Sequence, residues 1–167
     1  MAPKPSHSRP DPVSAPYNLD METPPPDHRH ARWLWALLGL FVLRVAAQPL
    51  AAATAWRWLP AFDTWQSGAL PYPALLAAQI GLAAGMAWAA AGVSSGRTRP
   101  RRAAGRWLAA AAAVYGVVMV FRLVSGATIY RGHWWLDAPL PTVFHLGLTT
   151  WLAVYGHYHL RDLAPRP

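Results

Sequence analysis

Four apolar blocks, each long enough to cross a membrane, dominate this 167-residue chain. They hold 19 to 21 residues each and cover 33–53, 74–93, 107–127 and 142–160. An α-helix rises about 1.5 Å per residue, so about 20 residues cross a hydrocarbon core about 30 Å thick. Only 13% of the residues are charged, against about 25% in a soluble domain. The sequence therefore predicts an all-α integral membrane protein with four transmembrane helices.

The positive charges predict how these helices are oriented. The net charge is +8, and eleven of the 15 Lys and Arg residues lie before the first block, between the second and third, or after the fourth. Only Arg57 and Arg131 lie in the other two connections. Because basic loops stay in the cytoplasm, we expect both termini and the 94–106 loop there, in a bacterial inner membrane. No nucleic-acid-binding motif accompanies the arginines, so we interpret them as a topology signal and expect no nucleic-acid partner.

The N-terminal segment differs from the rest of the chain in composition. Residues 1–30 contain eight of the 17 prolines, which predicts a disordered cytoplasmic tail. This tail has no apolar stretch typical of a signal peptide, so the first block is expected to act as an uncleaved insertion signal. A transmembrane domain is expected at 31–160 and a short cytoplasmic tail at 161–167. The absence of cysteine excludes disulfides and covalently attached c-type haem.

The two halves of the chain resemble each other. FVLRVAAQ (41–48) and MVFRLVSG (119–126) each place one arginine late in an outgoing helix. A Trp-rich connection with an Asp and a closing P-x-P follows each of them, at 54–73 and 128–141. Proline at the start of a helix loses no hydrogen bond, so these motifs suit the starts of the two returning helices. The pattern predicts two helical hairpins, compatible with a parallel internal repeat, although shared topology alone would produce part of the likeness.

Polar residues within the apolar blocks are the main functional signal. An arginine near the bilayer centre costs at least about 2.5 kcal/mol on insertion scales, so such residues normally face other helices and have a partner. In the predicted topology the outer half of the bilayer contains Arg44, Gln48, Gln79, Arg122 and His145. The blocks contain no Asp or Glu, which argues against a proton pump or an ion-coupled transporter.

These five residues predict a polar pocket that opens to the periplasmic face. The arginines would provide charge and the other three would provide hydrogen bonds, to a quinone, a lipid headgroup or an anionic small molecule. The available protein anions are Asp63 and Asp137 in the outer connections. The alternative is structural, because the arginines could bond these aspartates or extend to lipid phosphates and thereby hold the two hairpins together.

The fourth block carries a stripe of residues on one helix face. At steps of four and three residues it contains His145, Thr149, Leu152, Gly156 and His159. This spacing resembles that of the helix in di-haem cytochromes b that carries one ligand for each of two haems. The resemblance covers this one helix and implies a b-type haem electron-transfer subunit with His145 and His159 as axial ligands. The second axial ligands would have to come from His133, from the histidines before the first block, or from another subunit.

The last two histidines allow a further interpretation. His157 and His159 alternate, so on a continuing helix they point nearly opposite ways. If Gly156 ends the helix, an extended H-x-H could bind a metal together with His28 and His30. We favour the simpler interpretation, in which His157 and His159 mark the membrane boundary.

Small residues in the second block predict a helix-packing face. Gly81 and Gly85 are four residues apart, and Ala77 and Ala89 extend the row. A third hypothesis is therefore a structural or assembly subunit that forms a homo-oligomer or joins a larger membrane complex through this face. The chain contains no G-x-S-x-G, H-E-x-x-H, P-loop or G-x-G-x-x-G motif. These observations together favour a non-enzymatic membrane component.

Overall fold

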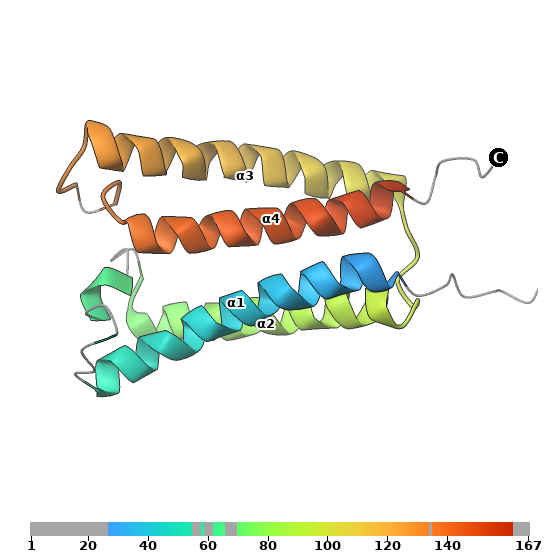
Figure 1. The fold of residues 1–167 in the computed structure, drawn as a ribbon, viewed down its shortest axis with the longest axis horizontal. Helices are drawn as coiled ribbons and strands as arrows, with labels where there is room; N and C mark the ends of the chain where they lie inside the picture. The colour runs from blue at the N-terminus through green and yellow to red at the C-terminus, as the bar shows by residue number, and fades with distance from the viewer. Residues whose placement is uncertain (1–26, 55–57, 59–61, 66–69, 134, 162–167) are drawn as a thin grey trace, which may run out of the picture.

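The computed structural model describes residues 27–54, 58, 62–65, 70–133 and 135–161 (Figure 1). Within these residues it contains four long α-helices, one short 3-10 helix and no strand. The helices are α1 (His28–Ala53), α2 (Tyr72–Ser94), α3 (Arg102–Thr128) and α4 (Pro139–Arg161), and the 3-10 helix is η1 (Phe62–Trp65). The prediction of an all-α fold with four helices is confirmed, and each helix contains one of the four apolar blocks. Of the predicted tails 1–30 and 161–167, residues 1–26 and 162–167 lie outside the described residues.

Local signals set where the helices begin. α1 starts three residues earlier than the predicted domain because Asp27 caps it, accepting hydrogen bonds from the backbone N–H groups of Arg29 and His30 (3.1 Å each). α2 has Pro73 within its first two positions and α4 begins at Pro139. In these positions proline leaves no intrahelical hydrogen bond unmade.

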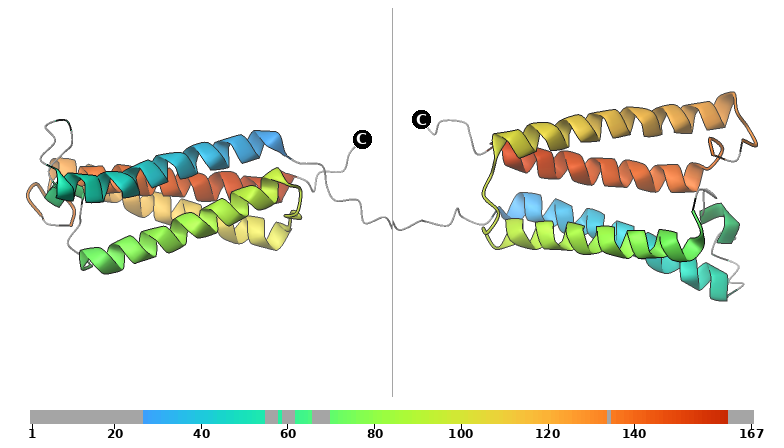
Figure 2. Two further views of the ribbon diagram at one scale, coloured as in Figure 1. Left: turned by 90° about the horizontal axis from the view of Figure 1, so that it is seen from below. Right: turned by 180° about the vertical axis from the view of Figure 1, so that it is seen from behind.

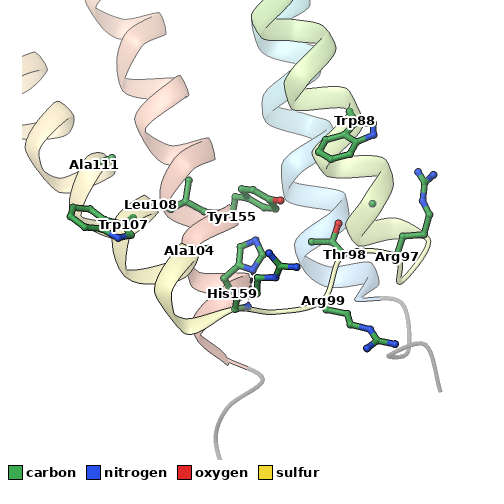
Figure 3. A pocket seen from close by; sticks show the side chains of 12 residues that line it. Trp88, Arg97, Thr98, Arg99, Ala104, Trp107, Leu108, Ala111, Tyr155 and His159 are labelled. Atoms are coloured by element: carbon green, nitrogen blue, oxygen red, sulfur yellow. Dashed lines mark hydrogen bonds between the residues drawn. The ribbon is translucent and has the colours of Figure 1, made fainter. Parts of the chain in front are cut away.

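The four helices lie side by side in the order α2, α1, α4, α3 (Figures 1 and 2). α1 contacts α2 and α4, and α3 contacts α4, whereas α2 and α3 do not touch within the described residues. The start of α1, the end of α4 and the 95–101 loop lie at one end of the molecule, which we call the basic end. The described residues of the connections 54–71 and 129–138 lie at the opposite end. Between α2 and α3, a cleft opens at the basic end (Figure 3).

The helix surfaces fit a membrane environment. α1, α2 and α3 are each long and apolar enough to cross a membrane, which supports a membrane protein. Their outer faces expose large apolar side chains such as Leu43, Trp107 and Val117. α4 is not among the three, because its histidines, threonines and tyrosines make it less apolar. α4 lies between α1 and α3, so neighbouring helices cover much of its polar surface.

Glycines bring α3 and α4 into close contact. A Cβ placed at Gly156 would lie 3.1 Å from the backbone nitrogen of Ala109 and 3.1 Å from Leu108 Cβ. A Cβ at Gly105 would lie 2.8 Å from the side chain of Leu160 and 3.1 Å from the carbonyl oxygen of Gly156. A Cβ at either position would force its neighbours to shift, so the glycine pair favours the close approach of the two helices.

Candidate functional site

The polar residues of α1 continue its buried face. Leu34, Leu38 and Phe41 form the apolar part of that face, and Arg44 and Gln48 extend it toward the end with the connections. Arg44 is 5% exposed and Gln48 is completely buried, although an arginine is almost never buried without a partner. The helix therefore directs one charged and one amide side chain into the protein, away from lipid.

Arg44 and Gln48 bind the same backbone atom. The carbonyl oxygen of Trp65 in η1 accepts hydrogen bonds from the Arg44 guanidinium (3.4 Å) and from Gln48 Nε2 (3.3 Å). The Trp65 ring stacks on Phe144 of α4, with ring centroids 6.3 Å apart, and the Arg44 guanidinium lies 5.3 Å from the Phe144 centroid. η1 thus closes over the polar end of α1 and connects it to α4.

Arg122 makes an equivalent contact in the second half of the chain. This residue is 2% exposed, and its Nε donates to the backbone carbonyl of Trp135 (2.8 Å). Its guanidinium lies 4.7 Å from the centroid of the Trp135 ring, a cation–π geometry. One helical turn further on, a Cβ at Gly126 would overlap the carbonyl oxygen of Leu136, so the connection lies directly on α3 there.

The two arginines converge on a tyrosine–histidine pair. The Tyr115 hydroxyl of α3 and His145 Nδ1 of α4 share a hydrogen bond of 2.7 Å. Both guanidinium groups are close enough to act electrostatically on Tyr115 and on His145. We call Arg44, Gln48, Tyr115, Arg122 and His145 the polar cluster. The structure thus brings together four of the predicted site residues and adds Tyr115, which lies seven residues before Arg122 and so on a similar face of α3.

Several buried polar atoms at this end of the molecule have no hydrogen-bond partner among the described residues. They are Arg44 Nε, Gln48 Oε1, Tyr72 Oη, Gln79 Oε1 and one terminal guanidinium nitrogen of Arg122. Gln79 is 7% exposed and lies on the α2 face that also buries Met86 and Val93. An unsatisfied buried polar group costs about 1–3 kcal/mol, so this concentration calls for a ligand or ordered water.

Neither of the two predicted aspartates is seen to pair with Arg44 or Arg122 in the described structure. Asp137 is exposed and accepts a hydrogen bond from the backbone N–H of Gly132 (2.6 Å). Within the described residues it forms no ion pair with Arg44 or Arg122. Asp63 lies in η1, and its side chain is outside the described part of the chain. The structural alternative, in which aspartates neutralise both arginines, therefore gains no support from Asp137.

The histidines of α4 lie in separate environments. His145 belongs to the polar cluster, and the Nδ1 of His159 accepts a hydrogen bond from the backbone N–H of Arg101 (3.2 Å) at the basic end. Each therefore keeps only Nε2 for a haem iron. Haem ligation stays a prediction, and an absorption spectrum without a Soret band after growth with ample haem would count against it. α4 continues past Gly156 to Arg161, so His157 and His159 are helical and not part of an extended H-x-H.

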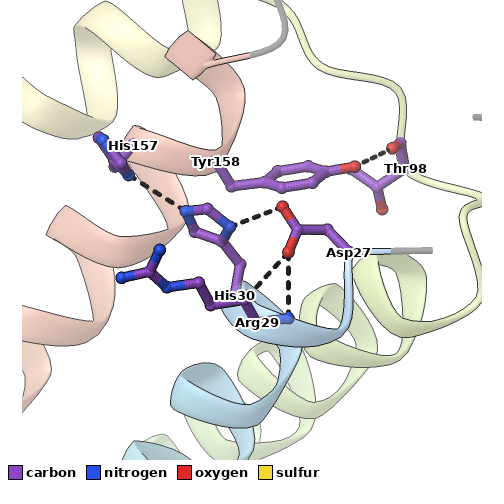
Figure 4. Close-up of polar contacts among 6 residues, drawn as sticks. All are labelled: Asp27, Arg29, His30, Thr98, His157 and Tyr158. Carbon is purple, nitrogen blue, oxygen red and sulfur yellow. Dashed lines mark hydrogen bonds and ion pairs between the residues drawn. The ribbon is translucent and has the colours of Figure 1, made fainter. Parts of the chain in front are cut away.

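His157 takes part in a polar chain that joins α1 to α4 at the basic end (Figure 4). His30 Nε2 lies 3.1 Å from His157 Nδ1, and His30 Nδ1 lies 2.7 Å from an oxygen of Asp27. Burial raises the pKa of Asp27, but hydrogen bonds from His30 and Arg29 and the charge of His30 outweigh it, so the pKa lies below its usual value of 3.8. No group of three metal-ligating side chains occurs in the part of the chain that the structure describes.

Asp27→Ala is expected to lower the free energy of unfolding by about 1 kcal/mol at neutral pH, because the helix cap is lost. Since folding lowers the pKa of Asp27, its contribution is complete above about pH 4 and disappears as the pH falls through the folded-state pKa. The difference in melting temperature between wild type and variant should therefore be smaller below pH 4 than at pH 5. Thermal unfolding in detergent measures this, and Asp27→Asn, which keeps a capping oxygen, is the control.

No protein-family model, curated protein sequence or solved structure matches this chain. The functional interpretation therefore depends on the residues themselves: two buried arginines, the tyrosine–histidine pair on which both act electrostatically, and the unsatisfied polar atoms nearby.

Proposed function

We propose that this chain is a four-span protein of a bacterial inner membrane, with both termini cytoplasmic. The described arginines support this orientation. At the basic end lie Arg29, Arg32, Arg97, Arg99, Arg101, Arg102, Arg106 and Arg161, whereas Arg131 lies in a connection at the opposite end. Under the positive-inside rule the basic end faces the cytoplasm and the polar cluster lies in the outer half of the bilayer.

The two halves are proposed to be hairpins of a parallel internal repeat. In support, α1 contacts α2 and α3 contacts α4. A more specific parallel is that Arg44 and Arg122 each donate to the backbone carbonyl of a tryptophan in the connection that follows their helix. Topology alone does not require this contact, so it favours a duplicated unit over a chance likeness.

The polar cluster is proposed to bind a small ligand as part of a larger membrane system. The observation that carries this proposal is the set of buried arginine and glutamine atoms without hydrogen-bond partners in the described residues. Arg44 and Arg122 also form no ion pair with a described carboxylate. Two positive charges without a described carboxylate partner in a low-dielectric region favour an anionic or strongly accepting group. A lipid headgroup or an anionic small molecule fits these charges better than a neutral quinone, whose carbonyl oxygens offer only hydrogen-bond acceptors.

The test combines two substitutions in the cluster. Arg44→Leu with Arg122→Leu is expected to remove the ligand, because both proposed cationic contacts are lost. Mass spectrometry of small molecules extracted from the detergent-purified protein should show one or more compounds in the wild type that the double variant lacks. Arg131→Leu is the matched control, since Arg131 is exposed in an outer connection and bonds the backbone carbonyl of Ala127. Equal recovery from wild type and double variant, with normal membrane insertion, would exclude the pocket.

A structural or assembly role is the second candidate, and one observation favours it. Among the described residues, no heavy atom outside the helix comes within 4 Å of a Cβ placed at Gly81 or Gly85. Ala89 of this row is buried in the core, but within the described residues Gly81 and Gly85 are open to a partner helix or a second copy. Gly85→Leu should then lower the oligomeric mass measured by light scattering, whereas Gly39→Leu, at an equally open position on α1, should not. An unchanged mass and unchanged co-purifying proteins would argue against this face.

A further inference from the structure

The cleft between α2 and α3 is a second candidate site, at the basic end and independent of the polar cluster. It has a volume of about 810 Å³. α2, the 95–101 loop and α3 surround it, and α4 forms its inner wall (Figure 3). In Figure 3, Tyr155 and His159 project from α4 toward the space that faces α2. This volume is within the range of small-molecule sites, which is about 300–1,000 Å³.

The part of the cleft that lies between the helices is apolar. Trp88 of α2 and Trp107 and Leu108 of α3 line it. Trp88 is 75% exposed and Trp107 is 78% exposed, so neither ring is covered by the protein. Because α2 and α3 make no contact, the cleft opens sideways toward the surroundings of the helices. In a membrane those surroundings are acyl chains, and tryptophan prefers the headgroup boundary.

The part of the cleft at the loop is cationic. Arg97, Arg99 and Arg101 line it, and none of them forms an ion pair with a carboxylate in the described residues. The sequence contains no Asp or Glu from 64 to 136 to balance them. Arg101, the N-cap residue of α3, makes no capping hydrogen bond with its side chain, so its guanidinium is not used in this way. These cationic side chains favour a negatively charged group.

We propose that this cleft binds an anionic phospholipid of the cytoplasmic leaflet. The headgroup phosphate lies against Arg97, Arg99 and Arg101, and one acyl chain extends between α2 and α3 past Trp88 and Trp107. Charge complementarity selects the headgroup, and the apolar lateral opening selects a lipid over a free anion. The bound lipid fills the gap between the two helices that do not touch, and so links the two halves of the protein.

Native mass spectrometry of the full chain in detergent tests this proposal with dioleoylphosphatidylglycerol as the probe. The wild type should retain this lipid much more strongly than dioleoylphosphatidylcholine. Arg97→Gln, Arg99→Gln and Arg101→Gln together should weaken retention at least about tenfold, since each basic residue near a membrane surface is worth about 1 kcal/mol toward anionic lipid. Ala111→Trp should also weaken it, because this change fills the cleft and keeps every charge.

Two matched controls separate this site from general attraction to a basic surface. The first is a triple variant that removes the same charge from the same end of the molecule but outside the cleft: Arg29→Gln, Arg32→Gln and Arg161→Gln. This variant should retain the lipid. Ala110→Trp adds the same bulk at an exposed position that does not line the cleft, and should also be neutral. Three results would each overturn the proposal. They are an equal loss of phosphatidylglycerol in the two triple variants, equal retention of phosphatidylglycerol and phosphatidylcholine by the wild type, and displacement of the lipid by millimolar inorganic phosphate.

Discussion

Replacing Gly156 by leucine is expected to lower the free energy of unfolding by about 3 kcal/mol, near the upper end for an overpacked contact. A Cβ at this position would lie 3.1 Å from the backbone nitrogen of Ala109, and leucine adds three more carbons beyond it. A backbone atom cannot relieve a steric clash by changing rotamer as a side chain can, so α3 has to move away from α4. Among the described helices α3 contacts only α4, so no second helix would hold α3 in place.

Thermal unfolding of the detergent-purified protein, followed by circular dichroism, measures this effect. Gly39→Leu is the control, because it makes the same chemical change on a helix where a Cβ has no neighbour within 4 Å in the described structure. Helix propensity changes equally in the two variants, so their difference reports the α3–α4 contact alone. Similar melting temperatures for the two variants would mean that the helices can separate without cost.

The helices were predictable from the sequence because their signal is local. A stretch of about 20 apolar residues in a membrane must satisfy its own backbone hydrogen bonds, which a helix does without help from the rest of the chain. Each predicted block lies within one observed helix. The start of α1 was less predictable. The proline-rich composition extends almost to Asp27 and predicts residues 28–30 as part of the tail, whereas the single side chain of Asp27 suffices to begin the helix there.

The convergence of Arg44, Arg122 and His145 was also predictable, because buried polar side chains in lipid must face other helices. Their actual partners were not. Both arginines donate to backbone carbonyls, those of Trp65 and Trp135. Because every residue has a backbone carbonyl, the sequence does not indicate which one an arginine will bind. The glycines show the same limit. Gly81 and Gly85 have the recognisable four-residue spacing, yet inside the chain the close contact uses Gly105 and Gly156, which lie on different helices.

Gly126→Ala is expected to disturb the polar cluster from a position outside it. Alanine favours a helix by about 1 kcal/mol over glycine, so the substitution should be stabilising if nothing else changed. A Cβ at Gly126 would instead overlap the carbonyl oxygen of Leu136 and lie 2.7 Å from its carbonyl carbon. The connection must shift, and with it the neighbouring carbonyl of Trp135, which accepts the 2.8 Å hydrogen bond from Arg122. We expect a net loss of at least about 2 kcal/mol and weaker retention of the ligand.

A double-mutant cycle with Arg122→Leu shows whether Gly126 acts through this hydrogen bond. If it does, Gly126→Ala should cost clearly less in the Arg122→Leu background than in the wild type, because the bond that it weakens is already missing. Gly39→Ala, at an open position, gives the stabilisation expected from helix propensity alone. Additive effects of the two substitutions would confine the role of Gly126 to packing of the connection. In that case the position of Arg122 would not depend on its hydrogen bond to the Trp135 carbonyl. The arginine-to-tryptophan carbonyl contact, which both halves of the chain make, would then not be needed to form the site.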